Sequence, residues 1–223
     1  MSQSMDDPHG GMPVATDGAP LALASAALIL VHGRGGSADD ILTLGPVLSQ
    51  DLPGGDRLAI LAPQARGNSW YPFSFLAPMA RNEPGITSGI GAIHALIGAA
   101  VDAGIPRERV VLGGFSQGAC LSMEYAARHA TRYGGLLAFS GGLIGPPGTP
   151  REYAGSLDGT PVFLGCSDAD PHIPADRVEE TAVVLGRLGG EVDRRFYPGM
   201  GHTIIDDEIQ AAREILRGVL ARE

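Results

Sequence analysis

The chain has 223 residues, of which 44% are hydrophobic and 18% are charged, and its formal net charge is −9. This length and composition fit one globular domain with enough apolar residues to form a core. The negative charge disfavours nucleic acid as a partner and gives no reason to expect stable membrane insertion.

The N-terminal part, rich in Gly, Pro, Asp and Ala, predicts a disordered tail over residues 1–24, followed by one domain over residues 25–223. It lacks the basic and apolar regions of a secretory signal, and the apolar run Leu21–Val31 is too short to span a bilayer. Cys120 and Cys166 are too few for a disulfide framework, which predicts a reduced, cytoplasmic protein. No residue spacing resembles a metal site, so no cofactor is expected.

Short apolar runs then alternate with helix-like patterns. The runs are apolar at successive positions, which is typical of parallel strands covered on both faces. The alternation predicts an α/β fold with a mostly parallel, doubly wound sheet, helices on both faces and no room for a cap domain. The predicted strands are Ala27–Val31, Arg57–Leu61, Val110–Gly113, Leu136–Phe139, Val162–Gly165 and Val192–Tyr197; the predicted helices are Ala38–Gln50, Ile86–Ala103, Gln117–His129, Asp176–Leu188 and Asp206–Leu220.

Two stretches, residues 66–85 and 144–159, show neither the hydrophobic periodicity of a helix nor that of a strand. Loops of this length inside a compact domain are usually functional or disordered. The first contains the only Trp of the chain and a concentration of aromatic residues, which indicates a substrate pocket, with ordinary core packing as the alternative. The aromatic residues proposed for the pocket wall are Trp70, Tyr71, Phe73 and Phe75.

The pentapeptide Gly114-Phe115-Ser116-Gln117-Gly118 lies between a predicted strand and a predicted helix. In that setting Gly-x-Ser-x-Gly forms a nucleophile elbow, in which the serine takes a strained conformation and the glycines remove clashing Cβ atoms. The pattern alone is weak in a chain with 33 Gly. Its setting favours Ser116 as the nucleophile of an acyl-transfer enzyme.

A serine nucleophile needs a general base and an acid that orients the base. His202 follows the last predicted strand and precedes the last predicted helix, where the base of such a triad belongs, whereas His129 ends the helix that Ser116 begins. His172 is a weaker alternative base that we expect either to line the site or to lie on the surface of the loop. The acid should come from the loop after the preceding strand, and spacing leaves both Asp168 and Asp170 open.

Acyl transfer also needs backbone N–H groups aimed at the developing oxyanion. Gln117, at the start of the predicted helix, is expected to supply one of them. The other should come from the loop His32-Gly33-Arg34-Gly35-Gly36, which follows the first core strand. A plain glycine turn is the alternative for this loop.

Taken together, the segments Val31-His32-Gly33-x-Gly35, Gly114–Gly118, Asp168–Pro174 and Gly201-His202 resemble the signature blocks of the phospholipase/carboxylesterase (acyl-protein thioesterase-like) family of α/β-hydrolases. The resemblance extends over residues 26–221. The Asp-Pro-x-Ile-Pro match favours Asp170 as the acid, with Asp168 in reserve. It implies a serine esterase with Ser116, His202 and Asp170 as the triad and the N–H groups of Arg34 and Gln117 as the oxyanion hole.

Arg34 and the Trp70-Tyr71-Pro72 segment depart from the thioesterases of that family and resemble a bacterial branch instead. Arg34 either recognises a substrate carboxylate or phosphate or is an exposed arginine without a role. The expected activity is cleavage of carboxylic esters, or thioesters, of small to medium acyl groups. The alternatives are an acyl-protein thioesterase or lysophospholipase, and a catalytically silent binding module. A homodimer is left open.

Overall fold

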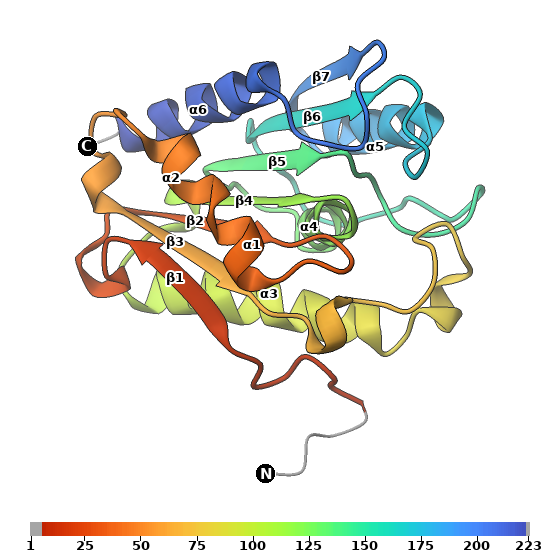
Figure 1. The fold of residues 1–223 in the computed structure, drawn as a ribbon, viewed down its shortest axis with the longest axis horizontal. Helices are drawn as coiled ribbons and strands as arrows, with labels where there is room; N and C mark the ends of the chain where they lie inside the picture. The colour runs from red at the N-terminus through yellow and green to blue at the C-terminus, as the bar shows by residue number, and fades with distance from the viewer. Residues whose placement is uncertain (1–5, 222–223) are drawn as a thin grey trace.

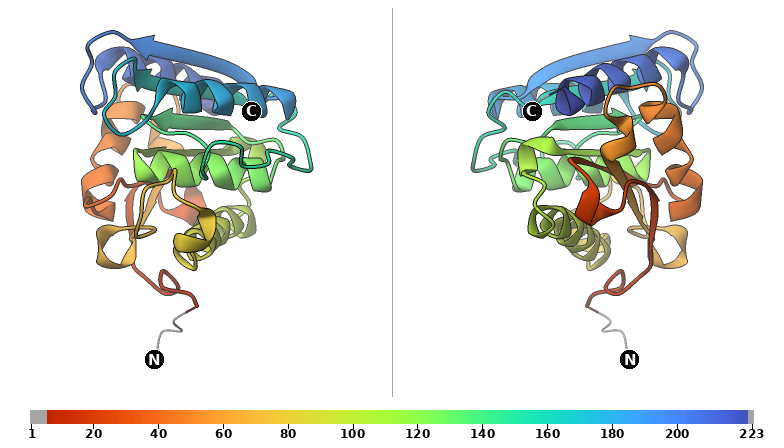
Figure 2. Two further views of the ribbon diagram at one scale, coloured as in Figure 1. Left: turned by 90° about the vertical axis from the view of Figure 1, so that its right-hand side faces the viewer. Right: turned by 90° about the vertical axis from the view of Figure 1, so that its left-hand side faces the viewer.

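The computed structural model describes residues 6–221, which form a seven-stranded sheet with helices on both faces (Figures 1 and 2). The strand order is β1-β3-β2-β4-β5-β6-β7, and every neighbouring pair is parallel except β1 and β3. The prediction of a mostly parallel, doubly wound sheet is confirmed. The strands are β1 (Val14–Gly18), β2 (Ala26–Val31), β3 (Leu58–Pro63), β4 (Val110–Phe115), β5 (Gly135–Phe139), β6 (Pro161–Ser167) and β7 (Glu191–Tyr197).

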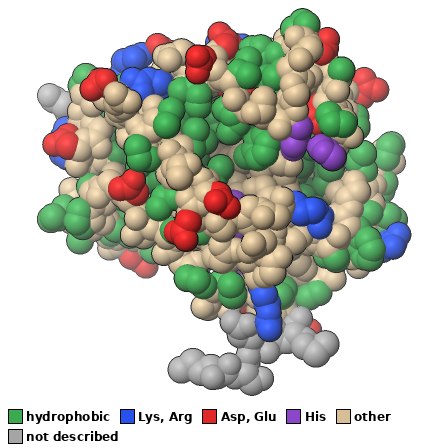
Figure 3. Space-filling model, in the orientation of Figure 1, with side chains coloured by type: hydrophobic (Ala, Val, Ile, Leu, Met, Phe, Trp, Pro, Cys, Tyr) green, Lys and Arg blue, Asp and Glu red, His purple; other side chains and the backbone are tan. Residues whose placement is uncertain are grey.

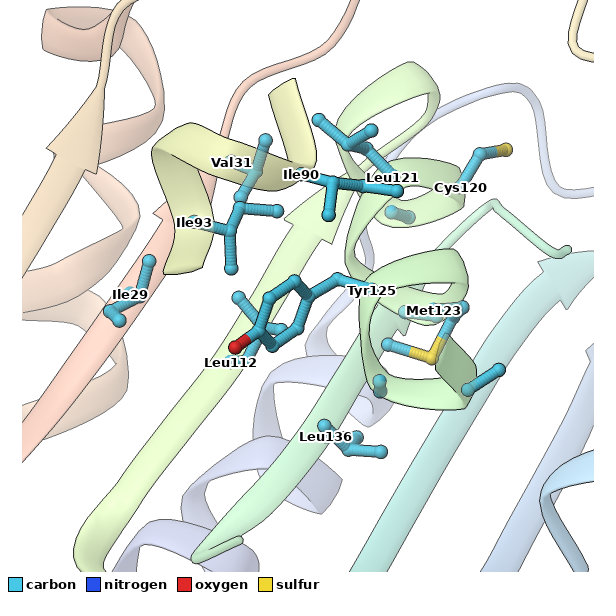
Figure 4. Packing of buried hydrophobic residues seen from close by; sticks show 14 of the residues in the cluster. Ile29, Val31, Ile90, Ile93, Leu112, Cys120, Leu121, Met123, Tyr125 and Leu136 are labelled. Atoms are coloured by element: carbon cyan, nitrogen blue, oxygen red, sulfur yellow. The ribbon is translucent and has the colours of Figure 1, made fainter. Parts of the chain in front are cut away.

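The helices divide between the two faces of the sheet, and each set has its own apolar cluster. On one face lie α1 (Ala38–Leu42), α2 (Leu44–Ser49) and α6 (Asp206–Leu220); on the other lie α3 (Gly85–Asp102), α4 (Gln117–Arg128) and α5 (Ala175–Arg187). Figure 4 shows the cluster beneath α3, α4 and α5, in which Ile90 and Ile93 of α3 and Leu121 of α4 lie together above β2 and β4. By length and composition α3 is apolar enough to cross a membrane, but 44% of it is buried in this cluster.

The sequence analysis predicted one helix over Ala38–Gln50, and the structure divides it into α1 and α2 at Thr43. Pro46 explains the break, because its nitrogen carries no hydrogen to donate to the carbonyl oxygen four residues earlier. Five short 3₁₀ turns connect other elements, at Leu21–Leu23, Gly55–Arg57, Arg66–Asn68, Met79–Arg81 and Arg107–Arg109.

The expected disordered tail covers residues 1–24, of which residues 1–5 lie outside the described part of the chain. The remainder is ordered: β1 pairs antiparallel with β3 from Val14↔Pro63 to Gly18↔Ala59. The His9 ring is buried, with Nε2 2.8 Å from the Trp70 carbonyl oxygen and Nδ1 accepting the Arg66 N–H. Main-chain pairing, rather than an apolar pattern, orders β1, so residue composition gave no signal for it.

The strand order places two loops over one point of the sheet. Between β3 and β4 the chain crosses from one side of β2 to the other, and α3 lies on the opposite face from α1 and α2. Ligands of open α/β sheets bind at the carboxyl ends of the strands at such a switch point. Since Val31 pairs with Gly114, the loops after β2 and β4 begin side by side there.

Glu208, in the first turn of α6, is a buried carboxyl group that follows the His202 loop. Its Oε2 accepts the Ile205 N–H at 3.0 Å, while Oε1 has no hydrogen-bond partner among the described residues. Burial raises the pKa of Glu208 to about 7. From about pH 4.5 to 7 the folded state therefore holds a proton that the unfolded state has lost, and the free energy of unfolding falls as the pH rises.

Glu208→Gln should remove this contribution, because an amide keeps an acceptor for Ile205 and does not ionise. We expect the melting temperature of the variant, relative to that of the wild type, to rise between pH 5 and pH 8. Thermal unfolding followed by circular dichroism at both pH values measures it. A difference between the two proteins that stays constant with pH would contradict this role of Glu208.

Candidate active site

Ser116 lies in the turn between β4 and α4, with φ 55° and ψ −119°. A positive φ is rare for a residue with a side chain and stores strain in the backbone. The turn is closed because a Cβ on Gly118 would lie 2.1 Å from the Val31 carbonyl oxygen, and a Cβ on Gly114 would lie 2.6 Å from the Gly118 carbonyl carbon. Both glycines of the pentapeptide are therefore required by the close approach of the backbone.

Gly118→Ala should destabilise the fold by about 3 kcal/mol, since the clash is with backbone that cannot rotate away. Gly91→Ala is the matched control: Gly91 lies on the exposed side of α3, and a Cβ there meets no atom within 4 Å. We expect it to stabilise by about 0.5–1 kcal/mol. Urea unfolding of both variants gives these values, and equal midpoints would contradict the argument.

The Ser116 side chain is the first member of a hydrogen-bonded row. Its Oγ lies 2.8 Å from Nε2 of His202, and Nδ1 of His202 lies 2.7 Å from Oδ2 of Asp170. The other carboxylate oxygen of Asp170 accepts the N–H groups of His172 and Ile173 at 2.8 and 3.0 Å. Ser116, His202 and Asp170 thus come from the loops after β4, β7 and β6, respectively.

The environment of Asp170 favours its ionised form. Partial burial raises the pKa of this carboxyl, but the hydrogen bonds from His202, His172 and Ile173 outweigh burial and lower the pKa below its usual value. A carboxylate there fixes the ring orientation of His202 and stabilises the imidazolium that forms when His202 takes a proton.

Asp168 has a different contact. Its Oδ1 accepts the Gly199 N–H at 3.3 Å, so it joins the acid loop to the loop that carries His202. Of the two acids left open by spacing, the structure places Asp170 on the histidine and Asp168 on the backbone of the next loop. His172 contacts His202 edge-to-face, with ring centroids 4.9 Å apart.

The loop after β2 lies against the elbow. A Cβ on Gly33 would be only 3.4 Å from Cβ of Ser116. His32 is buried and holds the loop, because Nδ1 lies 2.8 Å from the Gly33 carbonyl oxygen while Nε2 accepts the Ala65 N–H. Burial lowers the pKa of His32, which favours the neutral ring that this pair of bonds requires.

Two backbone N–H groups are available beside Ser116. Gln117 is the first residue of α4, so its N–H has no acceptor within the helix. The backbone N–H of Arg34 donates no hydrogen bond within residues 6–221. Gln117 belongs to the elbow, and Arg34 to the loop after β2 that lies against it. An oxyanion hole requires two such donors near one another.

A cavity of about 750 Å³ opens at Ser116. In Figure 3, histidine side chains are exposed on the side toward which the parallel strands point, near a basic side chain. Of the four aromatic residues predicted for the pocket wall, Tyr71 and Phe75 line the cavity. The other two do not: Trp70 is fully buried, and Phe73 is partly exposed and lies under the Arg81 guanidinium.

Sequence reasoning missed much of the apolar lining. Ile41 comes from α1 and Ile204 from the loop before α6, and no local sequence pattern joins them. Phe115 could have been found as the second residue of the pentapeptide; its ring lies 4.8 Å from that of His202. Cys120, one turn into α4, also lines the cavity, and burial raises the pKa of its thiol to about 12.

Comparison with known proteins agrees with the fold. A family model described as Phospholipase/Carboxylesterase matches residues 19–220. The crystal structure of a phospholipase/carboxylesterase from Dyadobacter fermentans DSM 18053 is similar, with a TM-score of 0.87 and 42% sequence identity over 92% of this chain and 97% of that one.

Two fungal proteins named acyl-protein thioesterase 1 are also similar. The Gibberella zeae protein is 33% identical over 147 residues, which make up 62% of this chain but only 61% of that relative's length. The Debaryomyces hansenii protein is 27% identical over 89% of this chain and 93% of its own length.

Proposed function

Because the chain belongs to the phospholipase/carboxylesterase family of α/β-hydrolases, we propose that it is a serine hydrolase that cleaves carboxylic esters. The observation that carries the proposal is the row Ser116 Oγ, His202 Nε2, His202 Nδ1 and Asp170 Oδ2, with separations of 2.8 and 2.7 Å. The strained Ser116 at the mouth of a cavity and the two unoccupied N–H groups beside it support the same proposal.

In the proposed mechanism His202 Nε2 takes the proton of Ser116 Oγ as that oxygen attacks the ester carbonyl. The backbone N–H groups of Arg34 and Gln117 stabilise the oxyanion of the tetrahedral intermediate. Protonated His202 then gives its proton to the leaving alcohol, and an acyl-enzyme remains. Water, deprotonated by His202, attacks the acyl group and releases the carboxylic acid with Ser116 restored.

The cavity favours small to medium acyl groups. At about 750 Å³ it is large enough for such a group together with its alcohol. Its walls are largely apolar, with Ile41, Phe75, Phe115, Ile173 and Ile204 contributing. Tyr71 and Phe75 are the residues of the predicted aromatic wall that we retain in the lining.

Thioester cleavage is the second candidate, supported by the similarity to proteins named acyl-protein thioesterase 1. A thioester carbonyl presents the same reacting atoms to Ser116. A catalytically silent binding module is disfavoured because nucleophile, base and acid are all within hydrogen-bond distance. Both described cysteines are free, which agrees with the proposed cytoplasmic location.

A kinetic panel tests the function. p-Nitrophenyl esters of two to twelve carbons should be compared with acyl-coenzyme A thioesters of the same chain lengths. We expect kcat/KM to peak among the short and medium esters. A maximum on long-chain thioesters would instead favour the thioesterase alternative, and absence of turnover on both series would overturn the proposal.

A further inference from the structure

Arg34 forms an unusually complete set of contacts with the aromatic loop. Its Nη1 donates to Ser69 Oγ and to the Pro72 carbonyl oxygen, both at 3.0 Å. Its Nη2 donates to the carbonyl oxygens of Tyr71 and Phe73, at 2.8 and 2.6 Å. A planar guanidinium with both terminal nitrogens engaged fixes the segment Ser69–Phe73, which we call the buttress, relative to the loop after β2.

Gln117 binds the same segment from the other side. Its Oε1 accepts the Trp70 N–H at 2.8 Å, and its Nε2 donates to the Tyr71 carbonyl oxygen at 2.9 Å. That carbonyl therefore receives both the Arg34 guanidinium and the Gln117 amide. The two residues whose backbone N–H groups face the proposed oxyanion are joined through their side chains at a single acceptor.

Further bonds hold the buttress in place. The Trp70 indole N–H donates to the His32 carbonyl oxygen at 2.9 Å, and the Gly35 N–H donates to the Asn68 carbonyl oxygen at 2.7 Å. Trp70 is fully buried, so the segment has a rigid foundation beneath the site. Tyr71, which lines the cavity, is part of the same segment.

We propose that Arg34 is a positioning residue whose side chain, through the buttress, holds its own backbone N–H at the correct spacing from that of Gln117. The inference rests on the proposed function, because it assigns the spacing to an oxyanion hole. Removing one oxyanion donor of a serine hydrolase lowers kcat by about 10²–10³-fold. Loosening a donor that is still present should lower kcat less, by about 10–100-fold.

The contacts also argue against the anion-recognition role considered for Arg34. Four of its N–H bonds are directed at the buttress, so the terminal nitrogens that would form a bidentate pair with a substrate carboxylate are already engaged. If Arg34 has a positioning role, its replacement should lower kcat equally on every ester. If Arg34 recognises an anion, its replacement should lower activity on anionic esters alone.

The test compares Arg34→Ala with Arg81→Ala. Arg81 is the matched control because its guanidinium stacks on Phe73 of the buttress, 4.2 Å from the ring centroid, while neither residue lines the cavity. Both variants are assayed on p-nitrophenyl acetate and on the anionic mono-p-nitrophenyl succinate. For Arg34→Ala we expect kcat to fall about 10–100-fold on both substrates with KM changed less than about threefold, and for Arg81→Ala a kcat within about twofold of the wild type.

A tetrahedral inhibitor separates positioning from a general effect on folding. Affinity for an alkyl boronic acid, which forms a tetrahedral adduct on the serine, should fall in parallel with kcat, while the KM of the substrate stays. Arg34→Lys, which keeps the charge and the chain length with fewer donors, should give an intermediate kcat, and it replaces Arg34→Ala if that variant fails to fold.

The inference is wrong if Arg34→Ala keeps the wild-type kcat, if its loss is confined to the succinate ester, or if Arg81→Ala loses as much. In each of these cases the proposed function stands as long as Ser116→Ala is inactive. If Ser116→Ala retains full turnover, the proposed function itself fails, and the inference fails with it.

Discussion

Ser116→Ala is expected to lower kcat/KM for p-nitrophenyl esters by at least about 10³-fold, because the covalent pathway is lost and only background stabilisation remains. The removal of one oxygen leaves the backbone of the elbow in place. The melting temperature should stay at or above that of the wild type, since within residues 6–221 the one hydrogen bond of Ser116 Oγ is to His202. Initial rates and thermal melting of the purified variant give both values.

Ser122→Ala is the matched control for this experiment. Ser122 is a fully buried serine of the same helix, and its Oγ donates to the Gly113 carbonyl oxygen at 3.3 Å, away from the cavity lining. We expect its kcat/KM to stay within about threefold of the wild type. Turnover by Ser116→Ala at a tenth of the wild-type rate or more would show that another group is the nucleophile.

Asp170→Asn should cost about 10³–10⁴-fold in kcat while leaving the fold intact. An amide offers His202 Nδ1 either a donor or a neutral acceptor, so the ring is no longer held in the tautomer that accepts the Ser116 proton, and the imidazolium loses its counter-charge. The N–H groups of His172 and Ile173 still find an acceptor in the Asn side-chain oxygen.

Asp168→Asn is the corresponding control, because the Asp168 carboxylate accepts the Gly199 N–H and an amide oxygen can replace that acceptor. We expect kcat of Asp168→Asn to fall by less than about tenfold. Comparable losses in the two variants would mean that both acids act on the histidine. A larger loss for Asp168→Asn would assign the triad acid to Asp168.

The sheet and the main site residues followed from patterns with a direct physical cause. Apolar runs between helical patterns mark buried parallel strands, and six of the seven strands were found in this way within a few residues of their bounds. Ser116 and His202 were predicted because the elbow and the loop after the last parallel strand have fixed places in the chain, and the structure brings their side chains within hydrogen-bond distance. The family expected from the sequence motifs is confirmed.

What the sequence analysis missed depends on contacts between distant segments. β1 is held by main-chain bonds to β3, and its side chains are mostly exposed, so no apolar pattern marks it. Trp70 was expected in the pocket wall because it is large and lies in a loop, but its indole N–H binds the His32 carbonyl oxygen beneath the site. The partners of Arg34 lie 35 to 39 residues away, beyond the reach of any local rule.

The most direct test of a serine nucleophile is intact-mass analysis after reaction with a fluorophosphonate, followed by peptide mapping. The wild type should gain one adduct, located on Ser116, and His202→Ala should react far more slowly under the same conditions. A wild-type protein that stays unlabelled, or that carries the adduct on any other residue, would contradict the account.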